Sequence, residues 1–150
     1  PNINSIISSL TEDGKTAVMV QKYLDKAIHG DKRVLIFNDF VFDECVRKLP
    51  GKDDFKFNTH ADKFFERAEL TPKEKEMALD VASKLSKTGL YMVGLDVIDE
   101  KIIEINVTSP CYFIREINHL DQTNFQNTLI SQIINFINAK TAKLYAKTNS

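Results

Sequence analysis

Residues 90–108 constrain the fold most strongly, because they hold two β-type runs separated by a very short connection. Residues 90–98 (LYMVGLDVI) are almost entirely apolar, and residues 101–108 (KIIEINVT) are rich in β-branched side chains. The dipeptide Asp99-Glu100 between them is short enough to close an antiparallel hairpin. A run as apolar as the first is typical of a central strand that is buried on both faces. We therefore expect residues 90–98 to form a central strand of a sheet.

A second hairpin is predicted earlier in the chain. Residues 33–37 and 40–46 are β-type runs around Asn38-Asp39, a dipeptide that accepts positive φ at little cost. Residues 17–24 (AVMVQKYL) are predicted to form a further strand. Residues 50–69 mix Lys, Asp and Phe without a clear period, and we expect a long loop there that could include short strands.

One helix is recognisable from its ends. Thr71 and Glu74 form a capping box, Pro72 takes the first helical position and Gly89 follows the last turn. The spacing of apolar residues predicts three more helices, at residues 4–10, 113–120 and 123–145. Because paired strands and helices are interspersed, the sequence predicts a single α+β domain over residues 1–150, with a mainly antiparallel sheet and helices packed on one face.

The composition excludes several classes of protein. The chain is 43% apolar and 27% charged with a net charge of −1, so it lacks the basic excess of a nucleic-acid-binding protein. No apolar run reaches the roughly 18 residues that a membrane span needs. The opening residues Pro1-Asn2-Ile3 have neither the basic nor the apolar region of a secretory signal, so we expect no such signal. We expect a cytoplasmic protein in which Cys45 and Cys111 are reduced thiols.

Two polar side chains interrupt the apolar run of residues 101–108. Glu104 and Asn106 are two positions apart on one strand, so both project from the same face of the sheet. Burying a carboxylate there is costly unless a cation meets it. On spacing alone, the two residues could equally belong to the solvated side of the sheet.

The length of the turn decides whether Asp96 joins them. A two-residue loop pairs Asp96 with Ile103, and the aspartate then points away from Glu104. A three-residue loop that ends at Lys101 places Asp96 directly opposite Glu104, with Asn106 on the same face. Two carboxylates and an amide oxygen suit Mg²⁺, which prefers hard oxygen ligands and shares its shell with phosphates. We favour the three-residue loop, because it gives Glu104 a partner.

Two further features could bind an anion. Arg33 enters a strand after Gly30-Asp31-Lys32, and its guanidinium matches a phosphate or a carboxylate, although an ordinary charged turn has the same pattern. Thr108-Ser109-Pro110 offers hydroxyls and loop amides directly after the proposed metal strand, although it could serve only to end that strand. The sequence contains no P-loop, dinucleotide-binding or HExxH motif.

Taken together, these segments resemble the C-terminal part of bacterial-type glutathione synthetase, an ATP-grasp ligase. The resemblance is carried by MVQKYLDKAIHGDKRVLIF (residues 19–37), GLYMVGLDVIDEKIIEINVTSP (residues 89–110) and IREI (residues 114–117). It implies an ATP-grasp C-terminal subdomain. It also implies an enzyme that joins γ-glutamylcysteine to glycine through an acyl phosphate, with ATP and Mg²⁺, or Mn²⁺ in its place, as cofactors.

The resemblance also implies a role for individual residues. The metal ligands would be Asp96, Glu104 and Asn106. The nucleotide would be held by the adenine hinge and its neighbours, namely Gln21, Lys22, Tyr23, Leu24, Asp31 at the ribose and Asn58. The reacting phosphate and the acyl substrate would be contacted by Arg33, Lys56, Thr108 and Ser109, of which Arg33 and Lys56 are the catalytic candidates.

The chain departs from the family pattern in three places. Residues 61–65 keep none of the glycines of the family's closing loop, Lys56 replaces an arginine, and one extra residue lies between Pro110 and Arg115. The N-terminal domain and the first ATP-grasp subdomain precede such a region in the family. We expect them in cis or as a separate chain, with no activity from this part alone and a homo-oligomeric whole. Another ATP-grasp carboxylate–amine ligase and a non-catalytic binding module remain alternatives.

Overall fold

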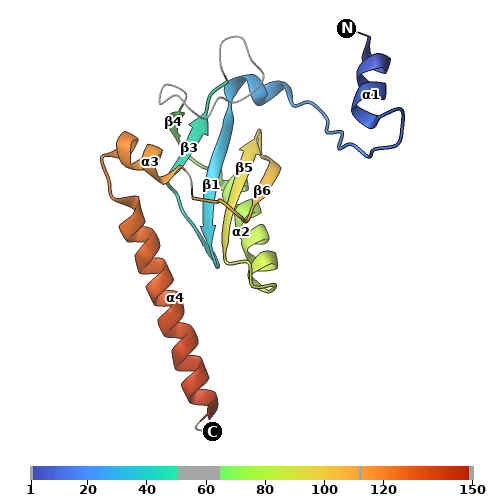
Figure 1. Cartoon of the computed structure of the whole chain (residues 1–150). Coiled ribbons are helices and arrows are strands. Elements are labelled where there is room, and N and C mark those ends of the chain that lie inside the picture. The colour runs from blue at the N-terminus through green and yellow to red at the C-terminus, as the bar shows by residue number, and fades with distance from the viewer. Residues whose placement is uncertain (1, 51–64, 112, 149–150) are drawn as a thin grey trace.

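The computed structural model describes residues 2–50, 65–111 and 113–148, and it is built around one antiparallel sheet (Figure 1). The strands run in the order β4-β3-β1-β5-β6, and β2 pairs with β1 beside this path. Their bounds are Asp31–Phe37 (β1), Phe40–Val41 (β2), Cys45–Lys48 (β3), Phe65–Ala68 (β4), Met92–Ile98 (β5) and Lys101–Asn106 (β6). The helices are Ile3–Thr11 (α1), the 3₁₀ helix Asp25–His29 (η1), Pro72–Ser86 (α2), Ile114–Asp121 (α3) and Phe125–Thr148 (α4).

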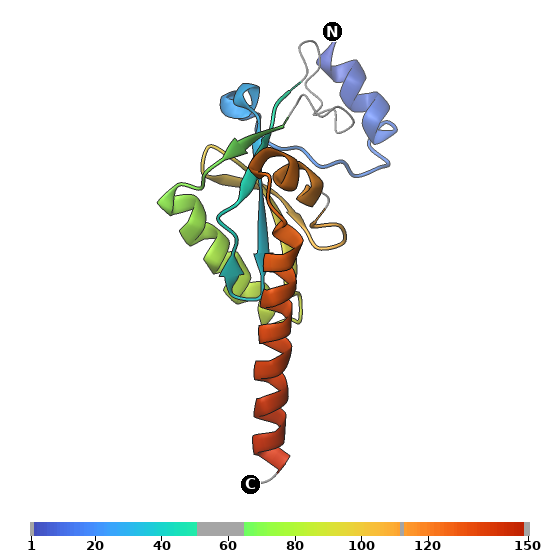
Figure 2. The ribbon, with the colours of Figure 1, turned by 90° about the vertical axis from the view of Figure 1, so that its left-hand side faces the viewer.

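The predicted α+β class is confirmed, but the prediction that all helices pack on one face is wrong. On one face, α2 covers a core of aliphatic residues from β1 and β5, such as Val34 and Leu95. On the other face, α3 and the first turns of α4 cover a core built around Leu35 and Phe42. Figure 2 shows α2 and α4 on opposite sides of the sheet. The physical reason is that β1 and β5 are apolar on both faces, so each face needs a cover.

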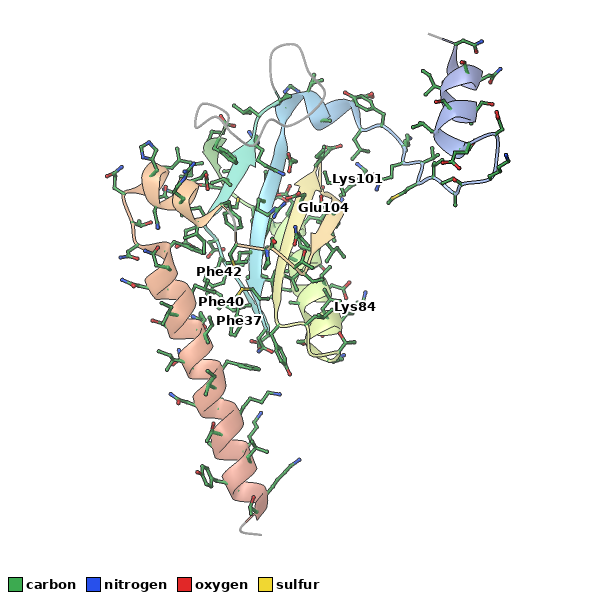
Figure 3. All side chains as sticks on the ribbon, viewed as in Figure 1. Phe37, Phe40, Phe42, Lys84, Lys101 and Glu104 are labelled. Atoms are coloured by element: carbon green, nitrogen blue, oxygen red, sulfur yellow. The ribbon has the colours of Figure 1, made fainter. Side chains whose placement is uncertain are left out.

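The second core is rich in aromatic rings. Phe42 packs against Phe40 and Phe125 with ring centroids 5.0 and 4.9 Å apart. Phe37 meets Phe136 of α4 edge-on at 5.6 Å. Figure 3 shows Phe37, Phe40 and Phe42 gathered on the side of β1 that faces α4. These contacts fix the beginning of α4 against the sheet.

The hairpin around Asn38-Asp39 is confirmed, but its second strand is interrupted. Only residues 40–41 form β2, and the chain then leaves the ladder after Phe42, whose N–H donates to the Leu35 carbonyl at 3.0 Å. It returns as β3, which pairs with the other end of β1. A continuous strand over residues 40–46 is therefore wrong, because one β1 edge serves two short strands in succession.

The strand predicted at residues 17–24 is also wrong. These residues form no strand in the structure, and almost all of them are exposed. A strand needs a ladder partner, and the segment runs along the outside of the molecule between α1 and η1 (Figure 1). Alternating apolar residues without a neighbouring strand therefore stay irregular.

The helices predicted from capping residues and apolar spacing are present in the structure. Glu74 N–H donates to Thr71 Oγ1 at 3.1 Å and Thr71 N–H donates to Glu74 Oε2 at 2.9 Å, so the capping box of α2 is formed. Helices also lie at the other three predicted places, and no helix in the described ranges is long and apolar enough to cross a bilayer. Both cysteines are free thiols.

Candidate functional site

The turn of the β5–β6 hairpin has two residues, so the favoured three-residue loop is wrong. Asp99 and Glu100 have φ values of 49° and 57°, and Ile98 pairs with Lys101. The expected pairing of Asp96 with Glu104 is nevertheless present, because the register shifts by one residue next to Asp96. Such a shift is a β-bulge, in which one extra residue enters one strand.

The bulge brings the three predicted metal ligands to one face. Asp96 lies opposite Glu104, and Gly94 lies opposite Asn106. Directly opposed residues of an antiparallel pair project to the same side, and residues two apart on a strand do so too. Asp96, Glu104 and Asn106 therefore share the face that α3 and α4 cover further along the sheet.

Asp96 belongs to a buried group of four charges on the same face, which we call the charge cluster: Asp31, Arg33, Lys48 and Asp96. Arg33 grips Asp96 with two nitrogens, as Nε donates to Oδ1 and Nη2 donates to Oδ2 at 2.7 Å. Lys48 Nζ lies 3.2 Å from Asp96 Oδ2 and 2.6 Å from Asp31 Oδ2. Two cations and two anions thus neutralise each other at one end of β1, β3 and β5.

Burial sets the electrostatics of this cluster. Removal from water raises the pKa of the Asp31 carboxyl above its ordinary value, and the nearby Lys48 ammonium lowers it only in part. Ionising Asp31 at this position therefore costs more free energy than in water, and the charge of Lys48 reduces that cost. Groups kept charged at such a cost are frequent in functional sites.

The loop after β6 turns back over the same face. Asn106 Oδ1 accepts from the N–H groups of Thr108 and Ser109 at 3.2 and 2.8 Å, which bends the chain. The loop then crosses Gly94, where a Cβ atom would stand 3.2 Å from the backbone of Pro110. Arg33 Nη1 would be only 3.4 Å from the same Cβ. The Thr108-Ser109-Pro110 loop thus passes close to Arg33, as an anion site shared by the two would require.

The donor set fits a hard divalent cation by its chemistry. Asp96, Glu104 and Asn106 offer carboxylate and amide oxygens, which are the ligands that Mg²⁺ prefers. Glu104 is exposed on β6 (Figure 3). The oxygens of Asp96 are engaged by Arg33 and Lys48, so a metal would share them with these cations. No cluster of three or more His, Cys, Asp or Glu side chains suited to a metal occurs within residues 2–50, 65–111 and 113–148, so an amide would have to complete the set.

The other predicted site residues fall in two groups. The hinge candidates run directly into η1, and among them Gln21, Lys22 and Tyr23 are exposed whereas Leu24 caps the helix. They precede the buried Asp31 by a few residues, which places hinge and cluster at the same end of the sheet. Lys56 and Asn58 lie outside the described residues.

Lys48 is the site residue that sequence reasoning missed. It closes β3, opposite Asp31, and its ammonium joins two carboxylates from different strands. The strand was predicted to end at residue 46, so Lys48 was assigned to no element. If the predicted strand is extended to residue 48, its side chains alternate between the two faces of the sheet, and Val46 and Lys48 lie on the same face. This alternation is the sequence signal that could have identified Lys48.

The chain matches the family model described as the prokaryotic glutathione synthetase ATP-grasp domain over residues 1–122. The chain belongs to this family. It is 40% identical over 117 residues to a glutathione synthetase of Vibrio cholerae, and 38% identical over 132 residues to one of a Nostoc species. A glutathione synthetase of Xylella fastidiosa is 37% identical over 110 residues.

These alignments take in most of this chain but much less of its relatives. They cover 78%, 88% and 73% of the chain and 36%, 40% and 35% of the three relatives, in the order given. The chain therefore spans less than half of the length of the glutathione synthetases it matches. Within the family, it corresponds to the ATP-grasp domain.

Proposed function

We propose that this chain is the C-terminal ATP-grasp portion of a glutathione synthetase. The whole enzyme would use ATP and Mg²⁺ to condense γ-glutamylcysteine with glycine through an acyl phosphate. The observation that carries the proposal is the register of the β5–β6 hairpin, which puts Asp96 opposite Glu104 with Asn106 on the same face. Family membership and the glutathione synthetases among the relatives support the reaction class.

The metal would be held by Asp96, Glu104 and Asn106, where it would offset the negative charge of the nucleotide phosphates. Arg33 and Lys48 already neutralise Asp96 in the chain. In the complex, these two cations would face the polyphosphate and the transferred phosphoryl group, whose charge must be stabilised during transfer. A buried guanidinium with fixed direction suits this role better than a solvated lysine.

The nucleotide and the donor substrate would lie along the same face. Residues 21–24 would receive the adenine through their backbone, and Asp31 would accept from the ribose hydroxyls. The loop amides and hydroxyls of Thr108 and Ser109 would bind the γ-glutamylcysteine end next to Arg33. Lys56 and Asn58 would contribute from the segment between β3 and β4.

The test is the substitution Glu104→Gln in the full-length protein, measured as ATP-dependent formation of glutathione at saturating Mg²⁺. Loss of a metal ligand should lower kcat at least about 100-fold, because a metal contributes several kcal/mol to charge stabilisation. Mn²⁺ affinity, followed by electron paramagnetic resonance in the presence of ATP, should fall in parallel. Glu76→Gln, on the exposed surface of α2, is the matched control and should change neither. Unchanged turnover in the Glu104→Gln variant would refute the metal assignment.

A further inference from the structure

A cavity lies between the turn that joins β1 to β2 and the middle of α4, and we call it the turn–helix pocket. Residues 37–39 line it on one side and residues 132–143 of α4 line it on the other. Its volume is about 420 Å³, which is within the range of small-molecule pockets. The match to the family model ends at residue 122, before α4 begins. Half of this pocket is therefore built from a part of the chain that the family model does not describe.

The turn–helix pocket is at the opposite end of β1 from the charge cluster. Asp31 is the first residue of β1 and Phe37 is the last. These two residues are six positions apart, which at about 3.3 Å per residue corresponds to about 20 Å along the strand. A ligand in this pocket would therefore be separate from the proposed metal and nucleotide sites.

The pocket has two cationic side chains and one anionic side chain. Lys140 and Lys143 lie three positions apart on α4, so they share a side of the helix, and Asp39 lies in the turn. Within the ranges that the structure describes, none of the three forms an ion pair with another side chain. The Lys140 ammonium instead lies over the rings of Tyr91 and Phe136, 5.5 and 5.3 Å from their centroids. Aromatic rings position an ammonium without neutralising it, so all three charges can pair with a ligand.

The uncharged groups of the pocket suit a molecule that contains amides. Gln132 and Asn135 line it, and in the described part of the chain their side-chain amides bond to no other group. Each can both donate and accept, as a peptide group requires of its partner. Asp39 is fixed at the edge, because its Oδ1 accepts from Asn38 Nδ2 at 2.6 Å. Phe37, on the side of β1 that faces α4 (Figure 3), supplies an apolar wall.

We propose that the turn–helix pocket is a second, non-catalytic site for a γ-glutamyl peptide, a small molecule with two carboxylates, one ammonium and at least one amide. The carboxylates pair with Lys140 and Lys143, and the ammonium donates to Asp39. The amide groups bond to Gln132 and Asn135. A nucleotide fits less well, because it offers no cation to Asp39.

This inference rests on the proposed function for the identity of the ligand. The donor substrate of that reaction, γ-glutamylcysteine, and its product, glutathione, both have the required charges. The distance from the charge cluster means that a peptide in the pocket is bound without being converted.

The first test follows the ¹³C-methyl resonance of Ala139, which lines the pocket, in the full-length protein under reducing conditions. The resonance should shift and saturate when glutathione or γ-glutamylcysteine is added, and the lower dissociation constant identifies the preferred peptide. Ala78, buried under α2 on the other face of the sheet, should not shift. Glutathione diethyl ester, in which both carboxylates are blocked, should leave Ala139 unchanged. An equal response to the diester would overturn the inference, and so would no response to either peptide at about 10 mM, where even a millimolar site is mostly filled.

The second test removes one charge at a time and uses the same Ala139 signal. Lys143→Gln should raise the dissociation constant of glutathione at least about threefold, as expected for an ion pair that is partly exposed to water. Lys147→Gln is the matched control, since Lys147 is on the same helix but outside the lining, and it should have less than a twofold effect. Asp39→Asn should weaken the binding of glutathione but not of N-acetylglutathione, which has no ammonium. Equal effects of Lys143→Gln and Lys147→Gln, or equal effects of Asp39→Asn on both ligands, would contradict the assigned contacts.

The outcome separates this site from the proposed function. If the full-length protein forms no glutathione yet Ala139 responds to the peptides, the proposed function fails while the pocket stands. If the protein forms glutathione and Ala139 does not respond, only the pocket fails.

Discussion

Removal of the Lys48 charge should be strongly destabilising, because one ammonium serves two buried carboxylates. Lys48 Nζ lies 2.6 Å from Asp31 and 3.2 Å from Asp96, and the Asp31 side chain is only 1% exposed. In the Lys48→Met variant, Asp96 keeps Arg33 as its counterion. Asp31 keeps no ion pair that the structure shows, so the main cost comes from this carboxylate.

The size of the effect follows from the burial of the pair. Removing one partner of a buried ion pair costs about 3–5 kcal/mol, because an uncompensated charge stays behind. The Lys48 side chain is 10% exposed, so some water can reach the vacated position, and we expect the lower end of this range. With a urea slope of about 2 kcal/mol/M, a loss of about 3 kcal/mol lowers the unfolding midpoint by about 1.5 M.

The assay is urea unfolding of the 150-residue chain, followed by far-ultraviolet circular dichroism, with Asp31→Asn as the second arm. In the Lys48→Met/Asp31→Asn double variant no uncompensated carboxylate remains, so about 2 kcal/mol of the loss should return. Lys84→Met is the control. Lys84 pairs with Asp80 on the surface of α2, and both are well exposed, so its removal should cost under about 0.5 kcal/mol.

The titration of Asp31 determines whether the stability of the folded chain rises or falls with pH. The pKa of Asp31 is raised in the folded state above its ordinary value of 3.8. Between these two pKa values the folded state binds more protons than the unfolded state, so stability falls as pH rises through this window. The Lys48 ammonium lowers the pKa of Asp31, so this pKa is raised further in Lys48→Met, and the deficit of the variant should shrink as pH is lowered toward 4. A cost below about 1 kcal/mol at pH 7, or no rescue by Asp31→Asn, would refute the account of the cluster.

Two further predictions concern the elements around the cluster. Gly30→Ala should destabilise the chain by about 2 kcal/mol in the same urea assay. Gly30 has a φ of 88°, and a Cβ atom there would collide with the Lys48 carbonyl oxygen. Gly14→Ala is the control, because Gly14 has a similar φ but open space around it, so this variant measures the backbone strain without the collision. Cys45 should react with a disulfide reagent at pH 8 at least about tenfold more slowly than Cys111, since burial raises the pKa of the Cys45 thiol to about 12; equal rates in the folded protein would contradict this.

Local signals predicted the elements whose interactions are local. The capping box of Thr71 and Glu74 satisfies backbone groups within one turn, so the start of α2 could be read from four residues. The Asn38-Asp39 turn and the β5–β6 hairpin were found for the same reason. The strand predicted at residues 17–24 failed, because a strand depends on a partner that its own residues do not specify.

In the candidate site, too, the sequence predicted the local features but not those that depend on distant parts of the chain. The sequence located Asp96, Glu104 and Asn106, but both turn lengths that it allowed assumed a regular ladder. The β-bulge that pairs Asp96 with Glu104 across a two-residue turn was not foreseen. Register follows from the packing of a whole face, and Ile102 lies against the aliphatic core under α2 while Glu104 faces the other side.

The sequence by itself determined the family, the α+β class and the types of side chain that surround the site. Only the tertiary structure decided that both faces of the sheet are covered, that Lys48 bridges Asp31 and Asp96, and that Asp39 shares a cavity with Lys140 and Lys143. Residue types and the spacing of neighbouring residues can be read directly from the sequence. Charge pairing and cavities arise between strands that are distant in sequence, where burial makes each unpaired group costly.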